Sequence, residues 1–362
     1  MAARYSMHHL GTAGILLAAA CEEPLPDAVW SGELVTVRSS ASDAELEEVC
    51  EGTFRRLDEY ARFLDDEFSI ESPKSRVDYL WFPGEDGPRS SCEGSPACAR
   101  GRVVYTSDAF DRHELTHAIR NGILHGPRVF EEGIAVVYGG HVEEDNLGTV
   151  ELLLSHLGGG DFPSGGYPTA GHFVSFLIPE FGLESFNAVT TRLGVASGQA
   201  AVEDVWLDVT GEPFSAAIDA YADYPACAPT LFANNSFDCG EEPSFIWGDA
   251  PGQITLTAAC GDGATVGTAT GRRQRSFTFE NTAHRLVSNV FVDNHGDAAV
   301  DVRVRLCGMS CWEATPFDEF ANFSDLTIGP GSSSHGMFSA VPGRFVVTVE
   351  SASDSRIDFR VE

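Results

Sequence analysis

Near Cys227 the chain changes its hydrophobic pattern, and this change limits the folds open to it. Before Cys227 most apolar stretches repeat with helical spacing, whereas after it short β-type runs alternate with turns rich in Gly, Asn, Asp and Ser. Short runs separated in this way predict an antiparallel β-sandwich. The runs are Ile254 to Ala258, Ser276 to Phe279, Leu286 to Val292, Val300 to Leu306, Phe345 to Val349 and Ile357 to Val361. We therefore predict a domain over residues 31–226 and a β-sandwich domain over residues 227–362.

The first of these domains is expected to mix helices and strands. Short β-type runs occupy residues 34–37, 77–82 and 103–106. Between the first two runs, Leu46, Phe54 and Leu57 recur at helical spacing among charged residues, which predicts one long amphipathic helix over residues 43–68. Further helical patterns cover residues 127–138, 151–157, 170–181, 184–193 and 213–221. The fold class predicted for the whole chain is α+β.

The first 21 residues have the pattern of an export signal. Arg4 gives a positive start, a short apolar run from Leu10 to Ala20 follows, and small residues lead into Cys21. The run is too short to span a bilayer. Residues Leu17 to Cys21 resemble a bacterial lipobox, which implies that Cys21 is lipidated and that residues 22–30 form a tether. The expected location is therefore the cell envelope, as a lipoprotein of the outer membrane or cell surface. The alternative is an ordinary signal peptide with a chance cysteine.

The cysteine count fits export. Nine cysteines are present, and eight remain when Cys21 is set aside. An even number in an exported chain predicts disulfides rather than catalytic thiols. Three pairs lie close in sequence and resemble local loop disulfides: Cys92 with Cys98, Cys227 with Cys239, and Cys307 with Cys311. Eight cysteines allow 105 connectivities, however, and the sequence does not choose among them.

The net charge excludes one class of partner. The chain has 54 acidic and 23 basic residues, a formal charge of −31, and Lys74 is its single lysine. A surface this acidic repels nucleic acids and anionic lipid headgroups. We therefore expect no nucleic-acid partner, and membrane contact only through the anchor at Cys21.

The segment His113-Glu114-Leu115-Thr116-His117 carries the clearest chemical information. On a helix, positions i and i+4 share a face, so His113 and His117 can bind one metal ion. Ser107 and Asp108 are the expected N-caps of this helix. Glu114 stands where a carboxylate can take a proton from water at the ion, which is the arrangement of a zinc hydrolase. The alternative is a surface helix that has two histidines without a metal.

A catalytic Zn²⁺ has three protein ligands and needs a third residue here. His125 is one candidate, but the spacing of the metzincin peptidases requires glycine and histidine where this chain has Arg120 and Ile123. Glu131 and Glu132 in the next helix are the other two candidates.

The run Phe130-Glu131-Glu132-Gly133-Ile134-Ala135 resembles the Glu-Gly-x-Ala segment of the gluzincin metallopeptidases. The resemblance implies that Glu132 is the third zinc ligand, with Glu131 as the fallback, and that Gly133 lets the second helix approach the first. It further implies a thermolysin-like catalytic domain, covering roughly residues 30–225. The link from His117 to Glu132 is shorter than in gluzincins of the aminopeptidase N type.

A second segment, from Tyr167 to Leu177, is similar to the aminopeptidase N-type segment whose tyrosine stabilises the oxyanion. This similarity implies that role for Tyr167, with Tyr138 and His172 as weaker alternatives. The Gly-x-Met-x-Asn segment that holds a substrate amino terminus is absent, so an endopeptidase acting on peptides or proteins is expected. In related folds an edge strand pairs with the substrate backbone, and residues 103–106 are expected to be that strand.

Two other interpretations of the whole chain remain open at this stage. The chain can be a surface-binding lipoprotein whose zinc site is structural or relict, or a zinc hydrolase of a non-peptide substrate.

In the second domain, the run from Val341 to Val349 resembles the closing strands of bacterial pre-peptidase C-terminal domains. Residues Asp293 to Asp297 have the composition of a calcium site, although a hairpin turn explains them better.

Overall fold

The structure is a computed structural model that describes residues 25–50, 52–68, 76–83, 86–121, 126–139, 147–159, 162–227, 232–234, 236–248, 251–267, 271–282, 287–308, 311, 326–339 and 342–362. The export signal with Cys21 and the ligand candidate His125 lie outside these residues, so both remain predictions. Within the described part of the chain, no helix combines the length and the apolar character needed to cross a membrane. The predicted mixture of helices and strands is confirmed.

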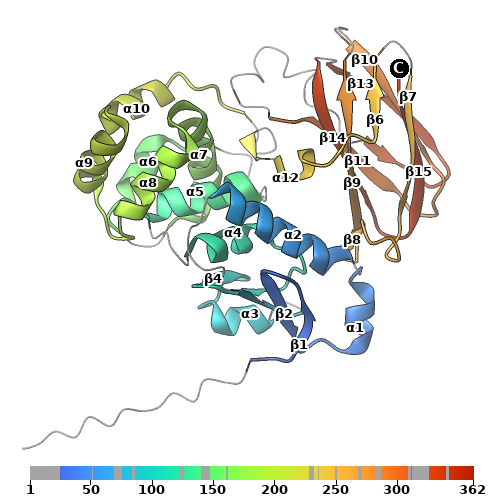
Figure 1. The fold of residues 1–362 in the computed structure, drawn as a ribbon, viewed down its shortest axis with the longest axis horizontal. Helices are drawn as coiled ribbons and strands as arrows, with labels where there is room; N and C mark the ends of the chain where they lie inside the picture. Colours follow the sequence, from blue (N-terminus) through green and yellow to red (C-terminus); the bar gives the residue numbers. More distant parts are fainter. Residues whose placement is uncertain are drawn as a thin grey trace, which may run out of the picture.

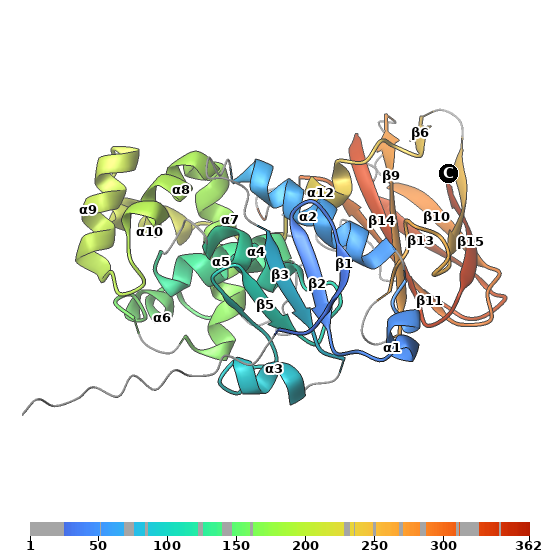
Figure 2. The ribbon, with the colours of Figure 1, turned by 60° about the horizontal axis from the view of Figure 1, so that its bottom comes forward.

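A five-stranded mixed sheet begins the fold (Figure 2). Its order is β1 (Ala28–Ser31), β2 (Val35–Ser39), β3 (Val77–Trp81), β5 (Val103–Thr106) and β4 (Cys98–Arg100). The strands β2, β3 and β5 are parallel, and β1 and β4 are antiparallel to their neighbours. The expectation that residues 103–106 form the edge strand is therefore wrong. A three-residue strand, β4, is paired to β5 on that side, and β4 is the edge.

Helices cover this sheet and form most of the first part of the chain (Figure 1). Their bounds are α1 (Asp43–Glu48), α2 (Gly52–Glu67), α3 (Asp86–Ser91), α4 (Arg112–Asn121), α5 (Arg128–Gly139), α6 (Val150–Ser155), η1 (Ser164–Gly166), α7 (Tyr167–Phe181), α8 (Leu183–Arg192), α9 (Gln199–Thr210), α10 (Phe214–Tyr221) and α12 (Ser236–Cys239).

The single helix predicted over residues 43–68 is instead two helices, α1 and α2. The chain turns at Cys50, whose disulfide partner is Cys260. At Gly52 a side chain would meet the Thr265 carbonyl oxygen at 2.4 Å, so the backbone there lies directly against the second half of the molecule. The tertiary contact at this point overrides the helical periodicity.

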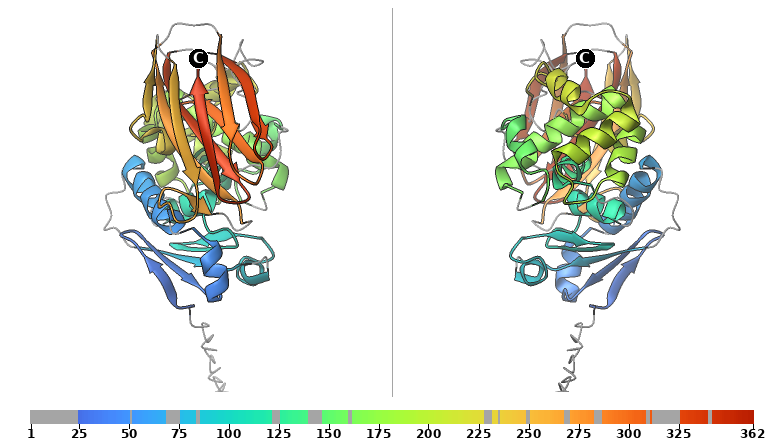
Figure 3. Two further views of the ribbon diagram at one scale, coloured as in Figure 1. Left: turned by 90° about the vertical axis from the view of Figure 1, so that its right-hand side faces the viewer. Right: turned by 90° about the vertical axis from the view of Figure 1, so that its left-hand side faces the viewer.

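Two sheets pack on each other in the second part of the chain (Figure 3). One contains β13 (Ser333–Ser339), β10 (Val287–Asn294), β15 (Ser355–Val361) and β7 (Gly252–Ala258). The other contains β12 (Leu326–Ile328), β11 (Val300–Leu306), β14 (Gly343–Ser351), β9 (Arg273–Asn281) and β6 (Phe245–Trp247), with β8 (Val266–Gly267) paired to β9. All strand pairs are antiparallel except β6 with β9.

The buried apolar side chains form two separate clusters. One lies among the five-stranded sheet and the helices, and the other fills the space between the two sheets of the sandwich. Phe232, Phe237 and Cys311 pack with the first cluster, although they lie beyond residue 227 in the sequence. Helix α2 lies between the five-stranded sheet and the sandwich (Figures 1 and 3).

The disulfides differ from most of the predicted pairs. Cys92–Cys98 is confirmed. The pairs Cys227–Cys239 and Cys307–Cys311 are wrong, because the bonds are Cys227–Cys311, Cys239–Cys307 and Cys50–Cys260. Packing of α12 against the sandwich brings Cys239 to Cys307, and packing of the start of α2 against the sandwich brings Cys50 to Cys260; the three bonds join cysteines that are 68 to 210 residues apart. Sequence proximity does not reveal this packing.

The segment 293–297 covers the end of β10 and the start of the turn to β11, which lies in the other sheet, so the predicted hairpin turn is wrong. The Asn294 amide donates to the carbonyl oxygens of Ala298 and Gly329, and its carbonyl oxygen accepts from the Gly296 N–H. Asn294 is buried, so its side chain organises the turn.

His172 is a residue of α7, and its ring lies in a cluster of aromatic side chains. Its Nδ1 is 2.7 Å from the Tyr221 hydroxyl, and its Nε2 is 3.0 Å from the Pro225 carbonyl oxygen. Burial disfavours the charged imidazole and lowers the pKa of His172 below its usual 6.5.

This pKa predicts an acid-sensitive contribution to stability. The unfolded chain takes up a proton at His172 below pH 6.5, whereas the folded chain resists it, so the contribution is complete above pH 6.5 and declines below it. We expect the difference in unfolding free energy between wild type and His172→Asn to shrink as the pH falls from 6.5 towards about 5. Urea unfolding across this range measures it, and a difference that does not change with pH would contradict the prediction.

Candidate metal centre

Helix α4 begins one residue after a carboxylate that the sequence analysis did not single out. Asp111 accepts from the Glu114 N–H at 3.0 Å, and the Leu115 N–H donates to the Asp111 carbonyl oxygen. Asp111 is therefore the N-cap, and the predicted caps Ser107 and Asp108 are wrong. Asp108 instead accepts from the Phe110 N–H in the preceding turn. The spacing Asp-x-x-Glu is a known cap pattern and could have revealed Asp111.

The cap leaves the Glu114 carboxylate available to the site. In a capping box the glutamate would turn back to the N–H of the cap residue. Here the Asp111 N–H donates to the Tyr79 hydroxyl at 2.8 Å, and Thr106 donates to the Asp111 carboxylate. Because β3 and β5 supply these partners, the side chain of Glu114 is not used to cap the helix.

His113 and His117 lie on one face of α4, while Leu115, Ala118 and Ile119 are buried on the other side. The two Nε2 atoms are 3.2 Å apart. Glu132 on α5 brings a carboxylate to the same point, with its Oε2 3.1 Å from Nε2 of His117 and 3.4 Å from Nε2 of His113. These three residues are called the candidate metal centre below.

The distances suit a zinc ion. With Zn–N and Zn–O bonds of about 2.0–2.1 Å and tetrahedral angles, neighbouring donor atoms lie roughly 3.3 Å apart. The three observed separations are 3.1, 3.2 and 3.4 Å. Two imidazoles and one carboxylate are also a donor set that zinc favours, and three protein ligands leave a fourth position for water or substrate. The residues present therefore fit Zn²⁺.

The two adjacent glutamates of α5 have different partners. The Glu131 carboxylate bonds to the buried guanidinium of Arg120 at 3.1 Å and accepts from the Gly126 N–H. Arg120 also donates to Asn187 at 2.9 Å and is fully buried. The structure thus brings Glu132 to the histidines and turns Glu131 away from them.

Burial disfavours an ionised Glu132, but its two histidine neighbours outweigh that effect and hold the pKa of Glu132 well below its usual range. Glu132 is therefore ionised at neutral pH, as a ligand must be.

Glu114 has the opposite electrostatic environment. Burial, followed by the negative charge of Asp111, raises the pKa of Glu114 to about 8; Glu132 adds to the rise, and His113 opposes it. The backbone of Ala99, on the edge strand β4, lies close enough to Glu114 to oppose this rise in pKa. The carboxyl group therefore lies between the candidate metal centre and the edge of the sheet.

Tyr167 is the first residue of α7 and lies beside the candidate metal centre. Its ring centroid is 6.1 Å from that of His113 and 5.3 Å from that of Phe162. Burial raises the pKa of Tyr167 to about 12, with further contributions from Glu132 and Glu114, so the hydroxyl is protonated at neutral pH.

The weaker alternatives to Tyr167 lie elsewhere. Tyr138 donates to Glu67, and His172 is held by Tyr221 and Pro225. His172 is also close to Cys227 and Cys311, but those two sulfur atoms are bonded to each other.

Two glycines of α5 allow close helix packing, but the one that was expected to face the histidine helix does not. At Gly133 a side chain would meet Val174 and Ala170 of α7, so the prediction that Gly133 faces the histidine helix is wrong. At Gly139 a Cβ atom would lie 2.8 Å from the His113 Cα and 2.9 Å from its nitrogen. Gly139 is therefore the residue that admits the backbone of His113.

Comparisons with known proteins provide little further information. No protein-family model matches the chain, and no curated protein matches its sequence. Among solved structures, the pre-peptidase C-terminal domain of a Bacillus anthracis collagenase aligns with 34% of this chain and 98% of its own, at 12% identity and a TM-score of 0.22. Legionella pneumophila aminopeptidase A, in complex with aspartic acid, aligns with 88% of this chain at 8% identity and a TM-score of 0.35.

The chain spans only 35% of that aminopeptidase. A third structure, the periplasmic lysozyme inhibitor PliG of Aeromonas hydrophila, aligns with 33% of this chain and 98% of its own, at 9% identity and a TM-score of 0.20. All three TM-scores are low, and the function proposed below rests on none of these likenesses.

The packing at Gly139 predicts a specific sensitivity. Gly139→Ala should push the first turn of α4 away and weaken zinc binding by about 10- to 100-fold, the range found for residues that orient metal ligands. Zinc titration against a competing chelator measures the change. Gly198→Ala is the matched control, because nothing lies within 4 Å of the added Cβ. Equal zinc affinity in the two variants would contradict the role given to Gly139.

Substitutions at the two glutamates should affect different properties, zinc binding at Glu132 and stability at Glu131. Glu132→Ala should abolish tight zinc binding and leave the metal-free protein close to wild type in melting temperature. Glu131→Ala removes the partner of a buried arginine and should cost about 3–5 kcal/mol of unfolding free energy, while the folded fraction still binds zinc. Zinc content and thermal unfolding decide this, and zinc lost only from the Glu131 variant would reverse the assignment.

Proposed function

We propose that this chain is a zinc-dependent peptidase of the gluzincin kind, with His113, His117 and Glu132 as zinc ligands. The observation that carries the proposal is the convergence of three donor atoms within 3.4 Å of one another. A protonatable carboxyl group, Glu114, lies next to them. Zinc, when bound there, supplies a Lewis acid that polarises a carbonyl group and makes water more acidic.

The protein groups around the candidate metal centre have distinct roles in peptide hydrolysis. Glu114 accepts a proton from the attacking water and passes it to the departing amine, which requires a carboxyl group able to take up and release a proton near neutral pH. Burial and Asp111 raise the pKa of Glu114, which makes its carboxylate a stronger base, and a zinc ion bound beside it would favour the ionised form that accepts the proton. Tyr167 keeps its proton and donates a hydrogen bond to the developing oxyanion.

The substrate is proposed to be a peptide or protein that lies along β4. This strand is the edge of the five-stranded sheet, and Ala99 on it reaches Glu114. An extended peptide can add to such an edge through backbone hydrogen bonds, which places its backbone next to the catalytic carboxyl group. Pairing along a strand does not require a chain end, so an endopeptidase is favoured.

The main alternative, a binding lipoprotein with a structural zinc site, fits the residues less well. Structural zinc sites are closed by four protein ligands. In the described residues three side chains converge. A structural site also has no need of a buried carboxyl group beside its first histidine. In the described part of the chain no arginine pairs with Glu114, so an ion pair does not account for this carboxyl group. We further propose that the enzyme is exported and anchored through Cys21, where its disulfides are stable.

The decisive test is Glu114→Gln, which keeps the shape of the side chain but removes its ability to accept a proton. Zinc content and melting temperature should stay near wild type, and cleavage of a peptide library should fall by about 10²- to 10⁴-fold. Glu203→Gln, a substitution on α9 that keeps an oxygen to accept from the Ser215 N–H, is the matched control and should cleave at the wild-type rate. If Glu114→Gln also cleaves at that rate, the proposed base is wrong. If wild type binds zinc but cleaves no peptide, the binding lipoprotein is favoured.

A further inference from the structure

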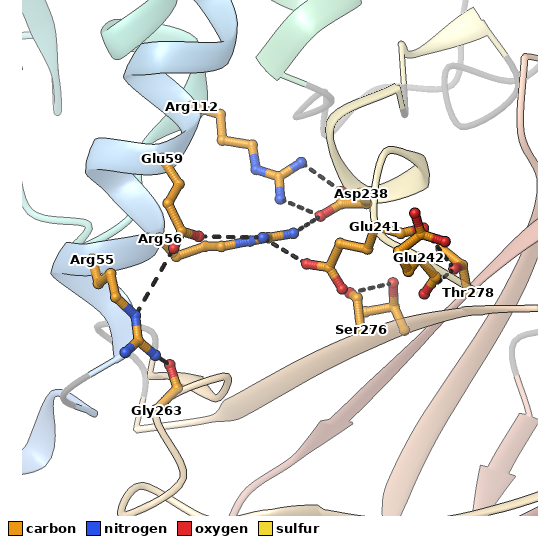
Figure 4. A network of polar contacts seen from close by, with 11 residues as sticks. Arg55, Arg56, Glu59, Arg112, Asp238, Glu241, Glu242, Gly263, Ser276 and Thr278 are labelled. Carbon is orange, nitrogen blue, oxygen red and sulfur yellow. Dashed lines mark hydrogen bonds and ion pairs between the residues drawn. The ribbon is translucent and has the colours of Figure 1, made fainter. Parts of the chain in front are cut away.

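A buried charge cluster joins the metal-site helix to the β-sandwich (Figure 4). Arg112, the first residue of α4, donates from both terminal nitrogens to the Asp238 carboxylate, at 2.8 and 3.0 Å. Arg56 of α2 reaches the same carboxylate at 3.1 Å and pairs with Glu241 at 2.7 Å. The side chains of Arg112 and Asp238 are only 17% and 14% exposed. Removing the Asp238 carboxylate would leave the largely buried Arg112 guanidinium without its anion, whereas Asp238 would still have Arg56 if Arg112 were removed.

The position of Arg112 on α4 makes this cluster relevant to the candidate metal centre. Arg112 directly precedes His113, and its guanidinium lies 5.0 Å from the centroids of the Tyr60 and Phe110 rings. A positive charge in the first turn of a helix opposes the helix dipole, so Arg112 lowers the stability of α4 unless an anion faces it. Asp238 is that anion, and its bidentate geometry fixes direction as well as distance.

Asp238 is in turn held by the β-sandwich. It lies on α12, a helix of four residues that is too short to be stable alone. The next residue, Cys239, is bonded to Cys307 at the end of β11, and Arg344 of β14 donates to the Cys239 carbonyl oxygen at 3.0 Å. Thr278 of β9 donates to the carbonyl oxygens of Glu241 and Glu242. The carboxylate that faces Arg112 is thus positioned from the sandwich.

We propose that Asp238 is a positioning residue for the zinc site, and that through Asp238 the β-sandwich helps to hold His113 in place. The proposal rests on the proposed function, since it takes His113 as a zinc ligand. A displaced first turn of α4 would move His113 relative to His117, which is one turn further along the helix. Zinc tolerates little change in the separation of its donor atoms.

The opposite end of α4 has a complementary anchor that shows what Asp238 adds. Arg120, in the last turn, bonds to Glu131 of α5, Asn187 and Thr190, all from the first part of the chain. That anchor joins α4 to the helix that carries Glu132. Without Asp238, α4 keeps the anchor near His117, while its first turn keeps the Asp111 cap but loses the ion pair of Arg112 next to His113. The effect therefore falls on the spacing between the two histidines.

The experiment uses the full-length mature protein with Asp238→Asn, and zinc alone as the ligand. We expect zinc affinity, measured against a competing chelator, to fall about tenfold. We also expect the visible spectrum of the Co²⁺-substituted protein to change. In the metal-free variant, amide hydrogen exchange over residues 107–117 should be faster than in wild type. Asp301→Asn is the matched control, because Asp301 pairs with Arg272 within the sandwich and should change none of these three measurements.

A second variant covers the case in which Asp238→Asn does not fold. Replacing both Cys239 and Cys307 with serine keeps the Asp238 residue but removes the covalent bond between α12 and the end of β11. Zinc affinity should again decrease. The proposal is overturned if the folded Asp238→Asn protein has wild-type zinc affinity and an unchanged Co²⁺ spectrum. If Asp238→Asn does not fold, unchanged zinc affinity in the double serine variant overturns it. If wild type itself binds no zinc, the proposed function fails too, and that result differs from a failure of Asp238 alone.

Discussion

Two buried arginines on α4 need carboxylate partners, and the rest of the site depends on how those partners are supplied. Taking a guanidinium out of water costs several kcal/mol unless a well-placed anion and further hydrogen bonds compensate it. Arg112 finds Asp238 at one end of the helix, and Arg120 finds Glu131 at the other. Because both partners come from other elements, satisfying these charges also fixes where α4 lies. The imidazoles of His113 and His117 are then aimed by the helix, with Asp111 as its cap.

The two adjacent glutamates of α5 illustrate how one helix serves stability and chemistry together. Successive residues of an α-helix point about 100° apart, so Glu131 and Glu132 cannot face the same neighbour. Glu131 compensates Arg120, and Glu132 reaches the histidines at 3.1 and 3.4 Å. The same contact that stabilises the crossing of α4 and α5 therefore brings Glu132 to the histidines. Gly139 completes the arrangement, since any side chain there would press on the backbone of His113.

Local sequence patterns predicted those features that depend on one element or on adjacent ones. The i, i+4 spacing of His113 and His117 and the longer β-type runs are of this kind, and so is Cys92–Cys98. Features that depend on contacts between distant segments were not predicted. The edge strand β4 has three residues, and β13, with the sequence Ser-Ser-His-Gly-Met-Phe-Ser, lacks apolar alternation. The partners of the other cysteines and of Gly133 and Gly139 are set by packing, which no local pattern records.

The charge cluster at Asp238 shows that a change in sequence composition need not mark a boundary between functional units. Residues after Cys227 differ in composition from those before, yet one of them compensates the charge next to His113. Helix α12 has only four residues and contributes little stability of its own. The direction of the Asp238 carboxylate therefore depends on the attachment of α12 to β9, β11 and β14, and on the packing of Phe237 against Tyr60 and Phe63 of α2. A covalent bond at Cys239 limits that movement more strictly than the hydrogen bonds alone can. Because Cys239 directly follows Asp238, the Cys239–Cys307 bond also helps to keep the first turn of α4 in place.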